Sequence, residues 1–322
     1  MGAISMGALA QSGSHGWLLV TNQKDQSLSI IDPVANKQVA AVPESGFTGH
    51  EVAASPDGKL AYVPIYGNSG VGKPGTDGST LDVIDVADRK IVQTLDFGHG
   101  VRPHKPIYDR NSGLLYVTTE LDKSVTAIDP KTMKVVASIP TGAAESHMLA
   151  ITRNGRYGYT ANVGPGSVSV LDLKAHKTVA VIPVAQHVQR ISLSNDDKYV
   201  FTVDYTQPKL AVIDTATNKV KTWVALPSIG YGTASTKDGR YLLVALTSAS
   251  KVAVVDLKAL KVAETIDVPE DPTEILVRPD GAVAYVSCGS SHKIAAIGIP
   301  DWKVRATIDA GKGADGLAWA GF

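Results

Sequence analysis

The sequence predicts a single all-β domain, a seven-bladed β-propeller, on the strength of one repeated phrase. The phrase starts with a polar residue, continues with small and β-branched residues, and ends in a turn. It begins at His50 and recurs with first residues at positions 104, 147, 189, 231, 273 and 315. The steps are 54, then 43, then 42 residues throughout. A fixed period of about 40–45 residues with several short strands per repeat is typical of β-propellers.

Each full repeat carries four short strand signals. In the third repeat they cover residues 147–152, 157–161, 168–172 and 178–182. Asp-Gly or Asn-Gly turns join strand pairs, and this dipeptide is the strongest short-range hairpin signal. Third strands end in an apolar residue followed by Asp, whose carboxylate can accept backbone N–H bonds in the next turn. We therefore expect four-stranded antiparallel blades.

The two ends of the chain predict how the ring closes. Residues 17–22, 27–32 and 37–42 match the second, third and fourth strands of a repeat, and residues 315–320 match a first strand. Together they complete a seventh blade, so residues 17–322 form one propeller. Pairing of the N- and C-terminal strands covers the sheet edges that an open ring would expose. Residues 1–16 are expected to be a leader.

The repeats resemble those of the YVTN-repeat β-propeller family over residues 17–320. The resemblance rests on these segments: Leu19-Val20-Thr21-Asn22, Tyr62-Val63, Tyr116-Val117-Thr118, Tyr159-Thr160-Ala161-Asn162, Tyr285-Val286-Ser287 and the Ser55-Pro56-Asp57-Gly58 turn. It implies seven blades and an exported protein, while the functions of such propellers are varied.

Composition excludes several classes of partner. Lys+Arg and Asp+Glu are both 31, so nothing indicates attraction to nucleic acid, and no apolar run is long enough to span a bilayer. Cys288 is the single cysteine, which rules out an internal disulfide and a thiolate metal cluster. Ala8-Leu9-Ala10 fits a signal-peptide cleavage site, which predicts a periplasmic or extracellular location; a flexible leader is the alternative.

Function is predicted at the first residue of the repeated phrase, because first strands line the central channel of a propeller. One residue per blade should then lie at the same height around the axis: His50, His104, His147, Gln189, Tyr231, Thr273 and Asp315. Three histidines on consecutive blades predict a site for one divalent transition metal (Zn, Mn, Fe or Cu), with Gln189 and Asp315 as further ligands. The alternative is a hydrated polar channel mouth without metal.

Charged groups flank this ring. Arg102, Lys105 and Glu51 are candidate substrate-binding residues, and Arg190 and Tyr231 are candidate catalytic residues that neutralise charge and move a proton. The alternative is that each flanking charge is solvated, because strand alternation points the residue after each ring position elsewhere.

The first repeat contains an insertion, residues 66–79, rich in Gly and polar residues. It is expected to be a loop on the same face as His50, with Tyr66 as a candidate substrate-binding residue. It is either an extended surface loop or a lid over the site.

These features predict an exported metal-binding propeller acting as a lyase or hydrolase on a small oxygen-rich or carboxylate substrate. Three alternatives stay open. One is a non-catalytic ligand-binding module with a possible protein partner on the loop face. The others are a histidine-ligated Fe or Cu oxygenase, and metal storage or sensing without turnover.

Overall fold

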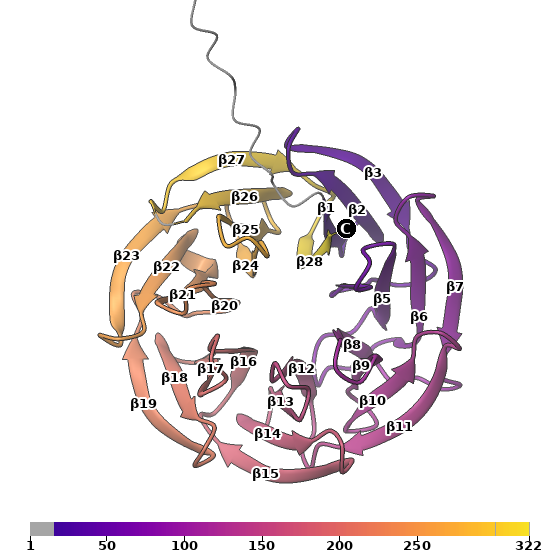
Figure 1. Ribbon diagram of the computed structural model, residues 1–322, viewed down its shortest axis with the longest axis horizontal. Coiled ribbons are helices and arrows are strands. Elements are labelled where there is room, and N and C mark those ends of the chain that lie inside the picture. The colour runs from indigo at the N-terminus through magenta and orange to yellow at the C-terminus, as the bar shows by residue number, and fades with distance from the viewer. Residues whose placement is uncertain (1–15, 300, 322) are drawn as a thin grey trace, which may run out of the picture.

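A computed structural model describes residues 16–299 and 301–321 of the chain. These residues form seven four-stranded sheets arranged around a central axis (Figure 1). The prediction of an all-β, seven-bladed propeller with four-stranded blades is confirmed. The predicted leader lies outside the described residues, except for Gly16, which begins the first strand.

The two inner strands of each blade run in opposite directions along the channel. The innermost strands are β4 (Ala53–Ala54), β8 (Pro103–Asp109), β12 (Ser146–Ile151), β16 (Val188–Leu193), β20 (Thr233–Ser235), β24 (Pro272–Val277) and β28 (Ala314–Gly321). The second strands are β5 (Leu60–Gly67), β9 (Leu114–Thr119), β13 (Tyr157–Asn162), β17 (Tyr199–Asp204), β21 (Tyr241–Leu246), β25 (Val283–Cys288) and β1 (Gly16–Asn22).

The two outer strands complete each blade. The third strands are β6 (Asp77–Asp85), β10 (Ser124–Asp129), β14 (Ser167–Asp172), β18 (Lys209–Asp214), β22 (Lys251–Asp256), β26 (Lys293–Gly298) and β2 (Ser27–Asp32). The fourth strands are β7 (Lys90–Asp96), β11 (Lys134–Pro140), β15 (Lys177–Pro183), β19 (Lys219–Ala225), β23 (Lys261–Asp267), β27 (Val304–Asp309) and β3 (Lys37–Pro43).

The seventh blade is assembled from both ends of the chain, as the sequence predicts. Its strand order is β28-β1-β2-β3, and β28 lies beside β1 in Figure 1. The two strands pair antiparallel, with Leu18 opposite Trp319 and Leu19 opposite Ala318. The ring is therefore closed by backbone hydrogen bonds between residues about 300 positions apart.

The hydrophobic core consists of seven clusters, each packed between two neighbouring blades. Successive side chains of a strand point to opposite faces of the blade, because side chains alternate with a period of two. One set therefore packs against the preceding blade and the other against the following blade. On β1, Leu19 packs toward the first blade and Leu18 toward the sixth. Every blade thus depends on both of its neighbours.

Turn chemistry follows the predicted rules. In the Asp-Gly and Asn-Gly turns, Gly58 and Gly155 adopt φ values of 71° and 67°, which a residue with a side chain rarely adopts. At the end of β2, Asp32 accepts hydrogen bonds from the N–H groups of Val34 and Ala35 at 2.8 and 3.0 Å. The recurrent apolar-Asp pair is therefore a structural device that holds each outer turn.

In the part of the chain that the structure describes, the one helix is a 3₁₀ turn, η1 (Thr247–Ala249). No helix there is long and apolar enough to cross a bilayer.

Leu317 tests the importance of ring closure. It is buried on β28 among side chains of the sixth and seventh blades. We expect Leu317→Ala to lower the free energy of unfolding in urea by about 2–5 kcal/mol, because it leaves a cavity in the closing blade. Leu121→Ala, at an exposed position, is the matched control. Equal losses for the two variants would contradict this account of closure.

Candidate functional site

The first strands β8, β12 and β28 and the segment just before β4 bring four of the seven predicted ring residues into contact. His50 Nδ1 lies 3.8 Å from Asp315 Oδ2. The ring centroids of His50 and His104 are 5.3 Å apart, and those of His104 and His147 are 3.5 Å apart. Equal spacing along the chain has thus become proximity in space. We call His50, His104 and His147 the histidine cluster.

A β-bulge in several first strands brings a second residue per blade into the channel. Pro103 pairs with Thr119 and Pro106 with Val117. An advance of three residues along β8 therefore matches an advance of two along β9, which leaves one extra residue on β8. The same irregularity occurs between Gln189 and Ser192 of β16 and between Pro272 and Ile275 of β24. Bulges re-aim side chains. Glu51, Lys105, Arg190 and Glu274 form ion pairs with one another, so the expectation that residues after the ring positions point elsewhere is wrong for the first, second, fourth and sixth blades.

His104 is the centre of the histidine cluster. It is 1% exposed, and neither ring nitrogen has a hydrogen-bond partner among the described residues. Burial and nearby positive charge hold the pKa of His104 well below its ordinary value. Burial, together with His147, lowers the pKa of His50 to about 3. Both imidazoles are therefore neutral at physiological pH, which is the form that binds metal ions.

Tyr66 closes the histidine cluster on one side. Its ring centroid lies 4.9, 5.3 and 5.5 Å from those of His50, His104 and His147. Its hydroxyl donates a 2.6 Å hydrogen bond to Glu120 Oε2, and His147 Nδ1 lies 3.2 Å from the same oxygen. Burial alone would raise the pKa of Glu120, but these bonds more than offset it, and the pKa is lowered.

The insertion continues from Tyr66 as a strap, residues 68–76, that reaches toward the third blade. Arg102 holds it by donating hydrogen bonds to the carbonyl oxygens of Gly70 and Lys73 at 3.3 and 2.7 Å. The strap also approaches Glu145 closely, since a Cβ at Gly72 would lie 2.6 Å from its carboxylate. Arg102 therefore fixes the strap rather than standing free for a substrate.

Ion pairs between the ring residue Asp315 and four residues that follow ring positions join blades across the channel. Lys105 Nζ donates to Glu51 Oε2 at 2.6 Å and to Glu274 Oε1 at 3.2 Å. Arg190 pairs with Glu51, and it reaches Glu274 and Asp315 at 2.7 Å each. We call these five residues the charged floor.

The charged floor is buried and its charges do not cancel. Burial alone would raise the pKa of Glu51, but Arg190 and Lys105 lower it below its ordinary value. The three carboxylates likewise hold the pKa of Arg190 well above its ordinary value, although burial opposes this. All five groups are thus paired, yet three carboxylates meet two cations, leaving one surplus negative charge.

The remaining predicted site residues are engaged elsewhere. Gln189 Oε1 accepts a hydrogen bond from the backbone N–H of Arg190, and Asp315 is bonded by Arg190 and Gln23. The ring of Tyr231 lies under the Arg190 guanidinium, 5.1 Å from its Cζ, away from the histidines. Within residues 16–299 and 301–321, no three His, Cys, Asp or Glu side chains are arranged to hold one ion. A ligand role for Gln189 or Asp315 stays a prediction.

Sequence reasoning missed three residues of the site. Glu274 follows Thr273 and occupies the same register as Glu51 and Arg190, so a bulge at each ring position would have indicated it. Glu120 and Gln23 lie just after second strands, on the loops that share the face of the ring. Nothing in the sequence indicated which of these loop residues would turn inward.

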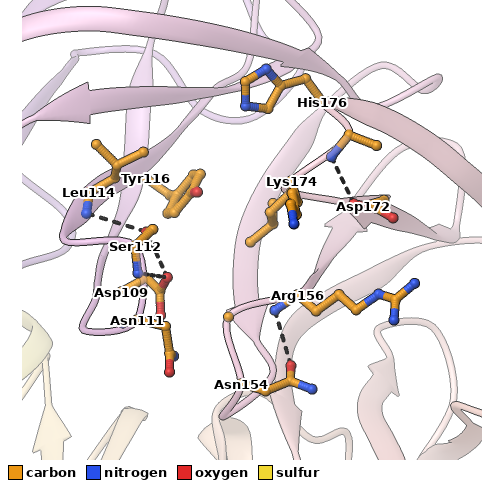
Figure 2. Close-up of a pocket in the computed structure, with 13 residues that line it drawn as sticks. Asp109, Asn111, Ser112, Leu114, Tyr116, Asn154, Arg156, Asp172, Lys174 and His176 are labelled. Atoms are coloured by element: carbon orange, nitrogen blue, oxygen red, sulfur yellow. Dashed lines mark hydrogen bonds between the residues drawn. The ribbon is translucent and has the colours of Figure 1, made fainter.

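A cavity of about 930 Å³ lies on the opposite face, between the second and third blades (Figure 2). His176 and Lys174 border one side of it and Asp109 and Ser112 the other. A similar cavity of about 470 Å³ lies two blades further on, where the blade residues Asp238, Gly239, Arg240, Asp256, Leu257 and Lys258 replace Asn154, Gly155, Arg156, Asp172, Leu173 and Lys174. Such grooves belong to the repeat and do not mark a site.

Comparisons place the chain among closed seven-bladed propellers. Residues 108–228 match the family described as "Cytochrome D1 heme domain". The fold is similar to that of a Kuenenia stuttgartiensis hydrazine synthase chain, with a TM-score of 0.73 and 18% identity over 93% of this chain and 99% of the other. It is also similar to the dihydro-heme d1 dehydrogenase NirN, solved in complex with DHE, with a TM-score of 0.69 and 14% identity over 95% and 76%.

No curated protein matches the sequence. At these identities the similarity to solved structures supports the architecture alone, a seven-bladed β-propeller. The function has to be inferred from the residues of the site.

The charge surplus of the floor gives a pH prediction for Asp315. Burial, together with repulsion from Glu51, raises the pKa of Asp315 to about 6, although Arg190 opposes it. A raised carboxyl pKa contributes stability that is present below about pH 4 and lost as the pH rises through 6. Asp315→Asn removes this titration. We therefore compare the free energy of unfolding of the variant with that of the wild type. From pH 4 to pH 7, this difference should shift in favour of the variant by up to about 3 kcal/mol.

Urea denaturation at pH 4, 5.5 and 7 measures the effect. Asp309→Asn, whose side chain is 83% exposed, is the matched control and should show no such trend. A difference between Asp315→Asn and wild type that does not change with pH would contradict the assignment.

Proposed function

We propose that the protein binds one divalent transition-metal ion at the histidine cluster, with His104 as the central ligand. The observation that carries the proposal is His104 itself, whose two ring nitrogens are buried without a partner beside two further imidazoles. A buried polar group without a hydrogen bond is costly, and a ligand at one nitrogen removes part of that cost. Zn, Mn, Fe and Cu are the candidate ions, and imidazole is a common ligand for Zn, Cu and Fe.

Glu120, which contacts His147, favours metal ligation through the Nε2 atom of His147. Glu120 accepts a hydrogen bond from Nδ1 of His147, which leaves Nε2 as the ligand atom, as in carboxylate–histidine–metal arrangements. The rings of His104 and His147 are only 31° from parallel, so one of them must rotate about its side-chain bonds for both to reach one ion. Metal binding at the histidine cluster therefore requires one of these side chains to rearrange.

A metal ion bound there would supply a Lewis acid that stabilises negative charge on an oxygen-rich or carboxylate substrate. Burial raises the pKa of Tyr231 above its ordinary value, although Arg190 opposes this, so its phenol stays protonated and can donate a hydrogen bond to a substrate oxygen. Arg190, bound to three carboxylates, fixes the floor and the Tyr231 ring. We propose lyase or hydrolase chemistry on this basis, in an exported protein of the YVTN-repeat type.

The heme group in the name of the matching family does not fit over the histidine cluster in this conformation. Tyr66 lies against all three imidazoles, and the strap that follows it is fixed by Arg102. The segment matching the family, residues 108–228, also contains neither His50 nor His104.

Metal titration tests the proposal. Protein purified without a nickel-binding tag and treated with chelator should bind one equivalent of Zn²⁺ or Co²⁺ at pH 7.5, followed by calorimetry and by the visible absorption of Co²⁺. Binding should raise the free energy of unfolding by about 2.7 kcal/mol at a free-metal concentration of about 100 Kd. We expect His104→Ala to abolish it.

His176→Ala is the matched control, because His176 lies at the cavity on the opposite face. It should bind metal like the wild type. Equal loss in both variants, or no stoichiometric binding by the wild type, would overturn the proposal. Stoichiometric metal without turnover over a panel of carboxylate substrates would leave binding intact and replace catalysis by storage or sensing.

A further inference from the structure

The half of the channel mouth away from the histidine cluster is an open pocket of about 230 Å³. Loops and first strands of the fourth to seventh blades line it. Its walls include Gln23, Lys24, Tyr205, Tyr231, Asp271 and Asp315. Typical pockets for drug-sized molecules measure about 300–1,000 Å³, so this one suits a ligand of few heavy atoms.

Two tyrosines form the aromatic part of the pocket. The rings of Tyr205 and Tyr231 have centroids 5.7 Å apart and planes tilted by 59°. Tyr205 is 45% exposed, a large aromatic surface left open at the mouth. The faces of such rings attract cations, and the Tyr231 ring already holds the Arg190 guanidinium in this way.

Two carboxylates form the charged part of the pocket. Asp315 belongs to the charged floor, whose acids exceed its cations by one. Asp271 accepts a hydrogen bond from the Ser290 hydroxyl and has no ion-pair partner within 4 Å among the residues that the structure describes.

Charge around the pocket stays negative when its cations are counted. Adding Asp271 to the three carboxylates of the floor gives four, against Arg190 and Lys105 in the floor and Lys24 in the pocket wall. Lys24 is exposed and long, so it can turn toward solvent when the pocket fills. Arg190 is already saturated by carboxylates. The pocket therefore favours a positive ligand over a neutral or negative one.

We infer that this pocket binds a small organic ammonium ion, of the size of tetramethylammonium or choline. The aromatic faces of Tyr205 and Tyr231 contact its methyl or methylene groups, and Asp271 and Asp315 balance its charge. A bare metal ion would not use the aromatic surface, and an anion would meet the surplus carboxylate. The inference concerns a second site in the mouth and does not rest on metal binding at the histidines.

Calorimetric or NMR titration of the full chain, treated with chelator, tests the inference with choline chloride. Its neutral isostere 3,3-dimethylbutan-1-ol is the comparison ligand, and NaCl at matched ionic strength corrects for salt. We expect saturable one-to-one binding of choline that is at least about tenfold tighter than that of the isostere. Tenfold corresponds to 1.4 kcal/mol, within the range of a partly desolvated cation–π contact.

Paired variants locate the binding. Tyr205→Leu should weaken choline binding about tenfold, whereas Tyr205→Phe, which keeps the ring, should not. Asp271→Asn should weaken it about tenfold, and Asn tolerates the φ of 64° at this position. The matched control is Asp309→Asn on an outer strand, which should bind like the wild type.

Equal affinity for choline and its isostere, normal binding by both Tyr205→Leu and Asp271→Asn, or no saturable binding would overturn the inference. Because the protein is metal-free in this experiment, its failure leaves the zinc or cobalt titration undecided. Failure of the metal titration likewise leaves choline binding undecided.

Discussion

The pairing of β28 with β1 is the constraint on which the rest of the structure depends. Each blade has a core only because two neighbours cover its faces, so an open ring would expose two apolar sheet faces. Closure by backbone hydrogen bonds between the two ends of the chain removes both faces at once. It also fixes the distance of every first strand from the axis. The close contacts among ring residues of different blades follow from that.

Bulges at the start of the first strands decide what enters the channel. A regular strand would send one residue inward and the next between blades. With an extra residue at Pro103–Pro106 and Gln189–Ser192, two successive side chains face the axis. The mouth thus contains two adjoining groups, the histidine cluster and the charged floor, which meet where Asp315 lies 3.8 Å from His50. The charged floor bridges opposite blades through Arg190 and Lys105.

The mouth is divided into two unlike halves. On the first three blades, Tyr66 and the strap cover neutral imidazoles, and Glu120 ties Tyr66 to His147. On the fourth to seventh blades, two tyrosines and two carboxylates border an open pocket. Gln23 joins the halves, because its amide lies 3.1 Å from His50 Nδ1 and also bonds Asp315. A ligand in one half therefore meets groups that contact the other.

The sequence by itself determined the number of blades, the strands, the closure of the ring and the seven residues, one per blade, that begin the first strands around its mouth. These properties follow from the regular period of the repeats and from the alternation of side chains along single strands. Both patterns can be read within one repeat, without knowledge of which repeats contact one another. It also indicated that His50, His104 and His147 would meet, because equal spacing becomes equal height.

Only the tertiary structure decided which charges pair and which groups are buried. The partners of Arg190 come from blades one, six and seven, and the sequence contains no signal that couples such distant positions. The same holds for Glu120, Gln23 and the Tyr205–Tyr231 pair. Bulges shift a side chain by one position without changing the period of the repeat. The charged floor therefore cannot be recognised from the period and becomes visible only when the strands lie side by side in the structure.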